Sequence, residues 1–201
     1  MERLIAGYRE FRGRRWPQER RLYEALAQDQ KPKTFVISCC DSRVDPATIF
    51  NARPGELFVA RNVANLVPPF EEGGRYHGTS AAVEFAVTAL KVETVLVLGH
   101  ARCGGVAAAL APAELPQGSF LAEWIRLLDP ALARCGDNAG DRQTAVERES
   151  VRLSLERLRS FPFVSEAVRS RGLALCGARF SIAAGTLEIL DPATDSFLEQ
   201  K

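Results

Sequence analysis

The chain has 201 residues, of which 46% are hydrophobic and 25% charged, a composition typical of a folded globular domain and unlike that of a disordered segment. Its 26 basic and 25 acidic residues almost cancel, which argues against a nucleic-acid partner or an anionic membrane surface. No apolar run approaches the roughly 20 residues that span a bilayer, and the N-terminus lacks the apolar stretch of a signal peptide. We therefore expect one cytoplasmic domain over residues 1–201, with no membrane or nucleic-acid partner.

The first half of the chain alternates predicted helices and strands. Residues 1–30 have apolar side chains at spacings of three and four, which predicts an N-terminal helical arm that Pro17 divides into two segments. A core region over residues 31–110 follows. Within it we expect strands at 34–38, 56–60 and 93–98, helices at 79–90 and 106–110, and a turn at 99–105.

The second half begins with residues 111–140, which are rich in Pro, Gly and Asp and are the stretch where insertions are most expected. Residues 141–201 predict C-terminal helices and an edge hairpin. The expected helices cover 144–159 and 163–171, the strand pieces cover 173–176 and 179–182, and an antiparallel strand covers 186–190. Because strands alternate with helices through most of the chain, we predict an α/β fold with a mostly parallel sheet.

Two strand ends carry side chains that suit a metal ion. His100 ends the third predicted strand and Cys103 follows three residues later, while Cys39 ends the first strand. The carboxyl ends of parallel strands line the functional crevice of such sheets, so these residues converge if the two strands are neighbours. Two thiolates and an imidazole suit tetrahedral zinc, and three protein ligands leave a position for a water that ionises near neutral pH. Because two thiolates neutralise the zinc charge, we expect that pKa to lie on the high side.

Asp41 and Arg43 follow Cys39 at alternate positions, so the three side chains can share one side of an extended segment. Two interpretations remain open. Asp41 takes the fourth zinc position and closes the site, or Arg43 holds Asp41 away through a bidentate ion pair. In the second case the carboxylate accepts the proton of zinc-bound hydroxide and orients its lone pair.

Other residues at these turns have less specific interpretations. Gly104 and Gly105 open a helix, where they allow close packing or expose backbone N–H groups to an anion such as bicarbonate. His77 is interpreted as a loop residue, and only weakly as a proton shuttle. Cys135 and Cys176 are interpreted as structural, and Cys40 is expected to point away from Cys39.

Four stretches resemble the β-class carbonic anhydrases: CCDSRVDPATIF at 39–50, PGELFVARNVANLVPP at 54–69, HGTSAAVEFAV at 77–87 and VLGHARCGGVAAAL at 97–110. The similarity continues through 149–168 and 180–191. The resemblance implies reversible hydration of carbon dioxide to bicarbonate and a proton, with one zinc per subunit held by Cys39, His100 and Cys103. It also implies an Asp41–Arg43 dyad, and N-terminal helices that embrace a second subunit in a homodimer or tetramer.

The resemblance is to the plant-like subgroup, whose site is open at neutral pH. It implies that Gln30 reaches into the neighbouring subunit's site and that Phe58 is an aromatic wall residue; Val63 and Phe85 complete an apolar lining for carbon dioxide. Phe85 stands where that subgroup has a tyrosine. A second bicarbonate pocket, which another subgroup builds from a tryptophan, an arginine and a tyrosine, is not expected, because those positions hold Val36, Arg61 and Phe180.

Three alternatives remain. The same fold and zinc could hydrolyse carbon disulfide or carbonyl sulfide, because access to the pocket decides the substrate. The zinc could be structural, with Cys39, Asp41, His100 and Cys103 all bound and no turnover. Thiol redox chemistry at Cys39-Cys40 is disfavoured, because adjacent cysteines on an extended segment point apart.

Overall fold

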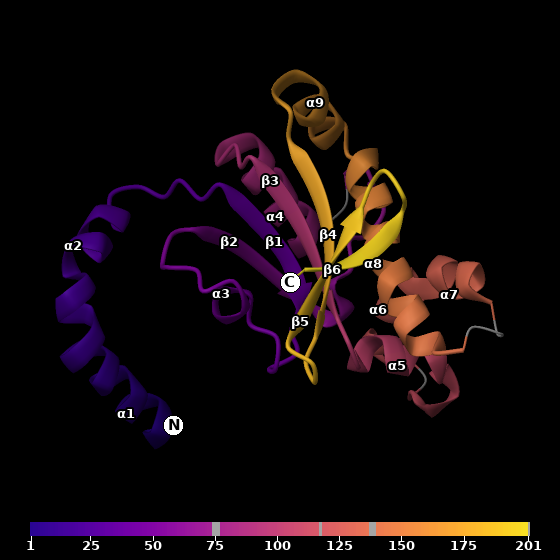
Figure 1. Ribbon diagram of the computed structural model, residues 1–201, viewed down its shortest axis with the longest axis horizontal. Helices are drawn as coiled ribbons and strands as arrows, with labels where there is room; N and C mark the ends of the chain where they lie inside the picture. Colours follow the sequence, from indigo (N-terminus) through magenta and orange to yellow (C-terminus); the bar gives the residue numbers. More distant parts are fainter. Residues whose placement is uncertain (74–76, 117, 137–139, 201) are drawn as a thin grey trace.

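A six-stranded sheet forms the centre of the computed structural model, which describes residues 1–73, 77–116, 118–136 and 140–200 (Figure 1). The strand order across the sheet is β2-β1-β3-β4-β5-β6. The first four strands run parallel and the last two antiparallel, which confirms the predicted α/β fold. The strands are β1 (Thr34–Cys39), β2 (Leu57–Asn62), β3 (Thr94–His100), β4 (Ala174–Ser181), β5 (Thr186–Asp191) and β6 (Ser196–Gln200).

One face of the sheet carries the main hydrophobic core. Helix α8 (Arg142–Ser160) crosses this face against β3 and β4, and α9 (Pro162–Arg171) and α4 (Gly78–Glu84) pack beside it. A Cβ added at Gly99 or Gly177 would lie 2.9 or 2.7 Å from the Val151 side chain, so glycine is what allows α8 to approach the sheet this closely. Within the described residues, no helix combines the length and hydrophobicity that crossing a bilayer requires.

A second hydrophobic cluster lies beyond the carboxyl ends of the parallel strands. It includes Cys39 and Cys103 together with side chains from α5 (Gly104–Leu110), α6 (Phe120–Ile125) and α7 (Asp129–Cys135). The short helix α3 (Pro46–Ile49) follows β1, and Asp45 caps it by accepting a 2.9 Å hydrogen bond from the Thr48 N–H. The remaining short helical turns are η2 (Val63–Asn65), η3 (Phe85–Ala89), η4 (Pro112–Glu114) and η5 (Arg126–Leu128).

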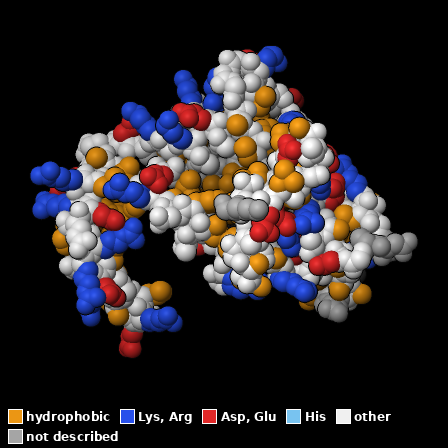
Figure 2. Space-filling model, in the orientation of Figure 1, with side chains coloured by type: hydrophobic (Ala, Val, Ile, Leu, Met, Phe, Trp, Pro, Cys, Tyr) orange, Lys and Arg blue, Asp and Glu red, His pale blue; other side chains and the backbone are white. Residues whose placement is uncertain are grey.

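The opposite face of the sheet is only partly covered. Figure 2 shows hydrophobic side chains gathered between the N-terminal arm and the C-terminal hairpin. Leu57, Leu96 and Leu187 are half-buried around the small cluster of Val36, Leu98 and Ala178. Val59, Ile189 and Leu198 are 38%, 37% and 50% exposed. We call these nine residues the open sheet face.

The N-terminal arm stands apart from the body of the molecule (Figure 1). It consists of α1 (Glu2–Glu10), a π-helical segment η1 (Phe11–Arg15) and α2 (Trp16–Leu26), none of which contains a buried residue. The predicted break at Pro17 is wrong, because the helical path continues through it. The π-helical segment η1 ends at Arg15, so Pro17 lies in the first turn of α2. The N–H that proline lacks would have no hydrogen-bond acceptor within α2 at that position.

The C-terminal half differs from the prediction in three further places. The region 111–140, for which the sequence predicted no helix, contains α6 and α7. The strand pieces 173–176 and 179–182 form one strand, β4, because Gly177 lies within the β3 pairing and gives α8 room. Strand β6 was not predicted. Its register is set by pairing with β5, and Arg148 and Arg152 lie over the Phe197 ring at 5.8 and 5.1 Å.

Candidate metal centre

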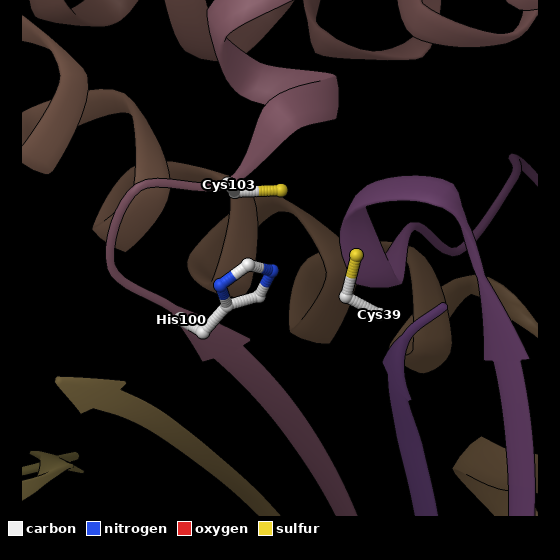
Figure 3. A group of neighbouring side chains, drawn as sticks. All are labelled: Cys39, His100 and Cys103. Atoms are coloured by element: carbon white, nitrogen blue, oxygen red, sulfur yellow. The ribbon is translucent and has the colours of Figure 1, made fainter. Parts of the chain in front are cut away.

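Cys39, His100 and Cys103 meet at one edge of the sheet. Cys39 is the last residue of β1 and His100 the last of β3, and these parallel strands are neighbours, so their ends lie side by side. Cys103 comes from the turn after β3, where Arg102 adopts a left-handed conformation (φ 56°) that reverses the chain into α5. The three side chains point toward one another (Figure 3), and their ligand atoms all lie within 4.8 Å of one another. The predicted convergence is confirmed.

The atoms of this triad are arranged as a metal would require. All three residues are at least 96% buried. The Nδ1 of His100 lies 3.0 Å from the Ala101 carbonyl oxygen, so the ring donates its proton there and turns Nε2 inward. This buried Nε2 has no hydrogen-bond partner among the described residues, which costs free energy unless a ligand completes it. Two sulfurs and one imidazole nitrogen are a donor set that fits zinc.

The two neighbouring thiols shift each other's pKa in opposite directions. The hydrogen bond between them lowers the pKa of Cys39 and raises the pKa of Cys103, and burial raises the pKa of Cys103 further. The Ala64 N–H also points at the Cys39 sulfur, at 3.4 Å, which favours its thiolate. Thiolates are the form that binds zinc, so the pocket favours the ligand state of Cys39 before any metal arrives.

Asp41 and Arg43 form the bidentate ion pair that was predicted as one of two alternatives. Arg43 donates from Nε to Oδ1 at 2.9 Å and from Nη2 to Oδ2 at 2.6 Å. Its Nη2 also donates to the Arg102 carbonyl at 3.2 Å, which ties it to the loop that carries Cys103. These donors hold the pKa of Asp41 well below its usual range. Asp41 Oδ2 lies 3.9 Å from His100 Nε2, beside the triad.

Arg61 on β2 supports the turn that holds this dyad. Its Nε donates to the Cys39 carbonyl at 2.9 Å, and its Nη2 donates to the Asp41 and Val44 carbonyls at 2.7 and 3.3 Å. From the sequence, Arg61 was related only to a second bicarbonate pocket, and these contacts with backbone carbonyls were not predicted. A lone arginine at the end of a strand gives no sign of which backbone carbonyls it will reach.

A second group, which was not predicted from the sequence, lies behind Cys103. Glu147 on α8 accepts a 3.1 Å hydrogen bond from the Cys103 N–H and pairs with Arg179. One signal was available. Glu147 shares a helix face with the buried residues Val151, Ser154 and Leu158, and a carboxylate at such a position calls for a buried partner.

The other predicted site residues divide into two groups. Val63 lies near the triad, because it begins the turn whose Ala64 contacts Cys39, and a Cβ at Gly105 would lie 2.8 Å from its side chain. Gly104 begins α5, and a Cβ there would meet open space. His77 lies farther along the chain at the start of α4, 3.9 Å from Glu71.

Phe58, Phe85 and Gln30 lie elsewhere. Phe58 pairs with Phe35, whereas Asn62 pairs with Cys39, so four residues of β2, about 13 Å of strand, separate Phe58 from the cysteine end. Phe85 stacks on Phe58 with ring centroids 5.7 Å apart. Gln30, in the segment between the arm and β1, lines a cavity of about 650 Å³ with Tyr23 and Gly55.

The chain is similar to carbonic anhydrases in both sequence and structure. A family model described as "Carbonic anhydrase" matches residues 34–187. Beta carbonic anhydrase 3 of Arabidopsis thaliana is 37% identical over 197 residues, which are 94% of this chain and 76% of that protein.

Two solved structures extend the similarity over the full chain. The β-carbonic anhydrase CcaA superposes with a TM-score of 0.89 at 29% identity, covering 100% of this chain and 92% of that one. A tetrameric β-carbonic anhydrase of Sordaria macrospora superposes with a TM-score of 0.84 at 28% identity, covering 100% and 98%.

Proposed function

Because the chain belongs to the β-class carbonic anhydrases, we propose that it catalyses the reversible hydration of carbon dioxide to bicarbonate and a proton at the Cys39–His100–Cys103 centre. The observation that carries this proposal is the buried triad itself, with its unpartnered Nε2, beside a carboxylate that an arginine holds in place. One zinc ion per subunit, when bound, supplies a water that ionises near neutral pH.

Asp41 and Arg43 orient the nucleophile in this proposal. Each carboxylate oxygen of Asp41 already accepts a bond from Arg43, so the carboxylate has one fixed direction. A carboxylate oxygen keeps further acceptor capacity, and Asp41 accepts the hydrogen of the attacking hydroxyl group. This contact aims the attacking lone pair at the carbon of carbon dioxide. The ion pair favours the open, plant-like form of the site, in which Asp41 does not act as a fourth ligand.

The substrate pocket takes residues from two subunits. Val63 and the open space above Gly104 belong to the same subunit as the triad, where backbone N–H groups can meet the bicarbonate product. Phe58, Phe85 and Gln30 lie too far along the sheet to reach their own triad, and we propose that they line the site of a second subunit. Carbon dioxide is small and apolar, so aromatic and aliphatic walls suit it better than charged groups do.

We propose that the N-terminal arm and the open sheet face form the interface of a homodimer, and a tetramer can form from two such dimers. The arm exposes Leu4, Ile5 and Tyr8 at 72%, 43% and 62%, and none of its residues is buried. A helix that exposes apolar side chains is stabilised when these side chains pack on another surface, and the open sheet face of a second copy offers such a surface. We place the protein in the cytoplasm, because a reducing compartment keeps the two sulfur ligands free.

The site has no second bicarbonate pocket in this proposal. Val36 and Phe180 offer no polar atom on their side chains, and Arg61 is already engaged by three backbone carbonyls. Inhibition of carbon dioxide hydration by added bicarbonate, its product, should therefore follow a hyperbolic curve. A sigmoidal curve would contradict this part of the proposal.

Stopped-flow measurement of carbon dioxide hydration between about pH 6.5 and 9 tests the proposed function, because that window brackets the ionisation of a water on catalytic zinc. The zinc-loaded protein should be active, and the rate should rise with pH as that water ionises. A zinc-loaded protein with no activity anywhere in this range would favour a structural zinc site. Turnover of carbon disulfide or carbonyl sulfide without carbon dioxide hydration would favour the related hydrolase.

A further inference from the structure

A buried ion pair lies directly behind Cys103. Glu147 on α8 is 2% exposed and Arg179 on β4 is 6% exposed. Arg179 donates to Glu147 Oε2 from Nε at 3.0 Å and from Nη2 at 2.8 Å. The other carboxylate oxygen, Oε1, accepts the 3.1 Å hydrogen bond from the Cys103 N–H. The Glu147 carboxylate therefore connects the backbone of Cys103 to Arg179 on β4, the strand next to β3.

Helix α8 holds Cys103 by both of its backbone groups. Besides the bond from Cys103 to Glu147, Gln143 Nε2 donates to the Cys103 carbonyl at 3.3 Å. Cys103 is the N-cap of α5, and the Ala107 N–H of that helix also donates to the Cys103 carbonyl at 3.0 Å. The direction of its Cα–Cβ bond, and with it the place of the sulfur, is consequently fixed by α8 together with the first turn of α5.

The Arg179 guanidinium is held by two further contacts, one on α8 and one on β5. Its Nη2 donates to Thr144 Oγ1 at 3.1 Å, and its Nη1 reaches Glu188 at 3.4 Å. Arg179 is paired across the sheet with Gly99, the residue before His100. A Cβ at Gly99 would lie 3.7 Å from the Glu147 carbonyl, so α8 rests on β3 at this point. One rigid frame thus positions both His100 and Cys103.

Stability alone does not explain this arrangement. Burying a carboxylate and a guanidinium removes both from water, and a hydrophobic pair of similar volume is often at least as stable. A hydrophobic residue at position 147 would, however, leave the Cys103 N–H without its acceptor. A glutamine at position 147 could not make both contacts either. If its amide oxygen accepts from the Cys103 N–H, its NH₂ group faces the N–H donors of Arg179.

We propose that Glu147 is a positioning residue for the metal centre, which fixes the Cys103 backbone so that its sulfur meets the metal together with Cys39 and His100. This inference rests on the zinc site proposed above. Groups that orient metal ligands typically change metal affinity or activity by about 10–100-fold when they are removed. The expected effect of losing Glu147 is therefore weaker zinc binding by about that factor.

The test compares Glu147→Gln with Glu149→Gln, a matched change on the same helix. Glu149 pairs with Arg134 and Arg152 and touches none of the candidate ligands. Zinc affinity is measured by competition with a chromophoric chelator, and the ligand geometry is followed by the visible absorption bands of the Co²⁺-substituted proteins. Glu147→Gln should bind zinc about 10–100-fold more weakly and shift the Co²⁺ bands, whereas Glu149→Gln should match the wild type.

Thermal unfolding of the metal-free proteins separates positioning from general stability. A Glu147→Gln protein that unfolds at a lower temperature but keeps wild-type zinc affinity and Co²⁺ bands would overturn the proposal. If Glu147→Gln does not fold, Glu147→Asp replaces it, since this change keeps the charge near Arg179 but shortens the reach to Cys103. Wild-type zinc binding by Glu147→Asp would then overturn the proposal. A wild-type protein that binds no zinc would remove the proposed function as well.

Discussion

Replacing Arg61 should loosen the turn that carries Asp41 and Arg43. Its two short bonds, at 2.7 and 2.9 Å, join a charged donor to backbone carbonyls, and each such bond contributes about 1.5–3 kcal/mol. The third bond, at 3.3 Å, is too long to add much. Because the Arg61 side chain is 31% exposed, water can hydrate the freed carbonyls, and we expect Arg61→Met to lose less than the full sum of about 3–6 kcal/mol for the two bonds, about 2–3 kcal/mol.

Circular dichroism can measure this loss as a fall of about 4–12 °C in the unfolding midpoint, since 1 kcal/mol shifts a chain of this size by about 2–4 °C. The looser dyad should also lower kcat by about 10–100-fold, because small misplacements of orienting groups are costly. The stability and kcat of Arg61→Lys should lie between those of the wild type and Arg61→Met, since one ammonium group can reach fewer carbonyls. Arg53→Met, an exposed arginine in the turn before β2, is the control. Unchanged stability and kcat in Arg61→Met would refute this reasoning.

Three further predictions concern the metal, pH and assembly. Cys39→Ser should lose zinc, measured by metal analysis after dialysis, whereas Cys40→Ser should retain it because Cys40 is exposed. Glu188→Gln should destabilise the protein by about 1–2 kcal/mol at pH 7 in urea unfolding. The hydrogen bond from Arg148 lowers the pKa of Glu188, so this contribution is fully present above the ordinary glutamate pKa and is lost as the pH falls from there through the lowered pKa. An equal destabilisation by Glu188→Gln at pH 3 would contradict this. Leu4→Glu with Tyr8→Glu should dissociate the oligomer in light scattering, and an unchanged mass would exclude the arm from the interface.

The triad could be predicted because its residues stand at the ends of two apolar strands. Parallel strands bring their carboxyl ends together, so Cys39 and His100 needed only adjacent strands to meet, and Cys103 needed only a short turn. The Asp41–Arg43 pair is equally local. The triad and the ion pair depend on spacing within a few residues and on which strands are neighbours, and both can be predicted from the sequence pattern.

Glu147 and Arg61 could not be assigned from the sequence, because their contacts connect residues that are distant in the chain. Glu147 reaches Cys103 only because α8 crosses β3 at Gly99, and that crossing depends on packing around Val151. The continuous arm was missed for a local reason. Proline usually interrupts a helix, and the π turn that accommodates Pro17 has no simple sequence signal.

The separation of Cys39 from the other two ligands also has a consequence for biosynthesis. During translation, the emerging chain first presents one of the three candidate ligands, Cys39, and the His100–Cys103 pair follows more than sixty residues later. Two donors on one turn are a poor match for a tetrahedral ion, so a growing chain cannot capture zinc firmly until β1 and β3 have paired. In the proposed zinc enzyme, firm metal uptake therefore requires that β1 and β3 have already paired.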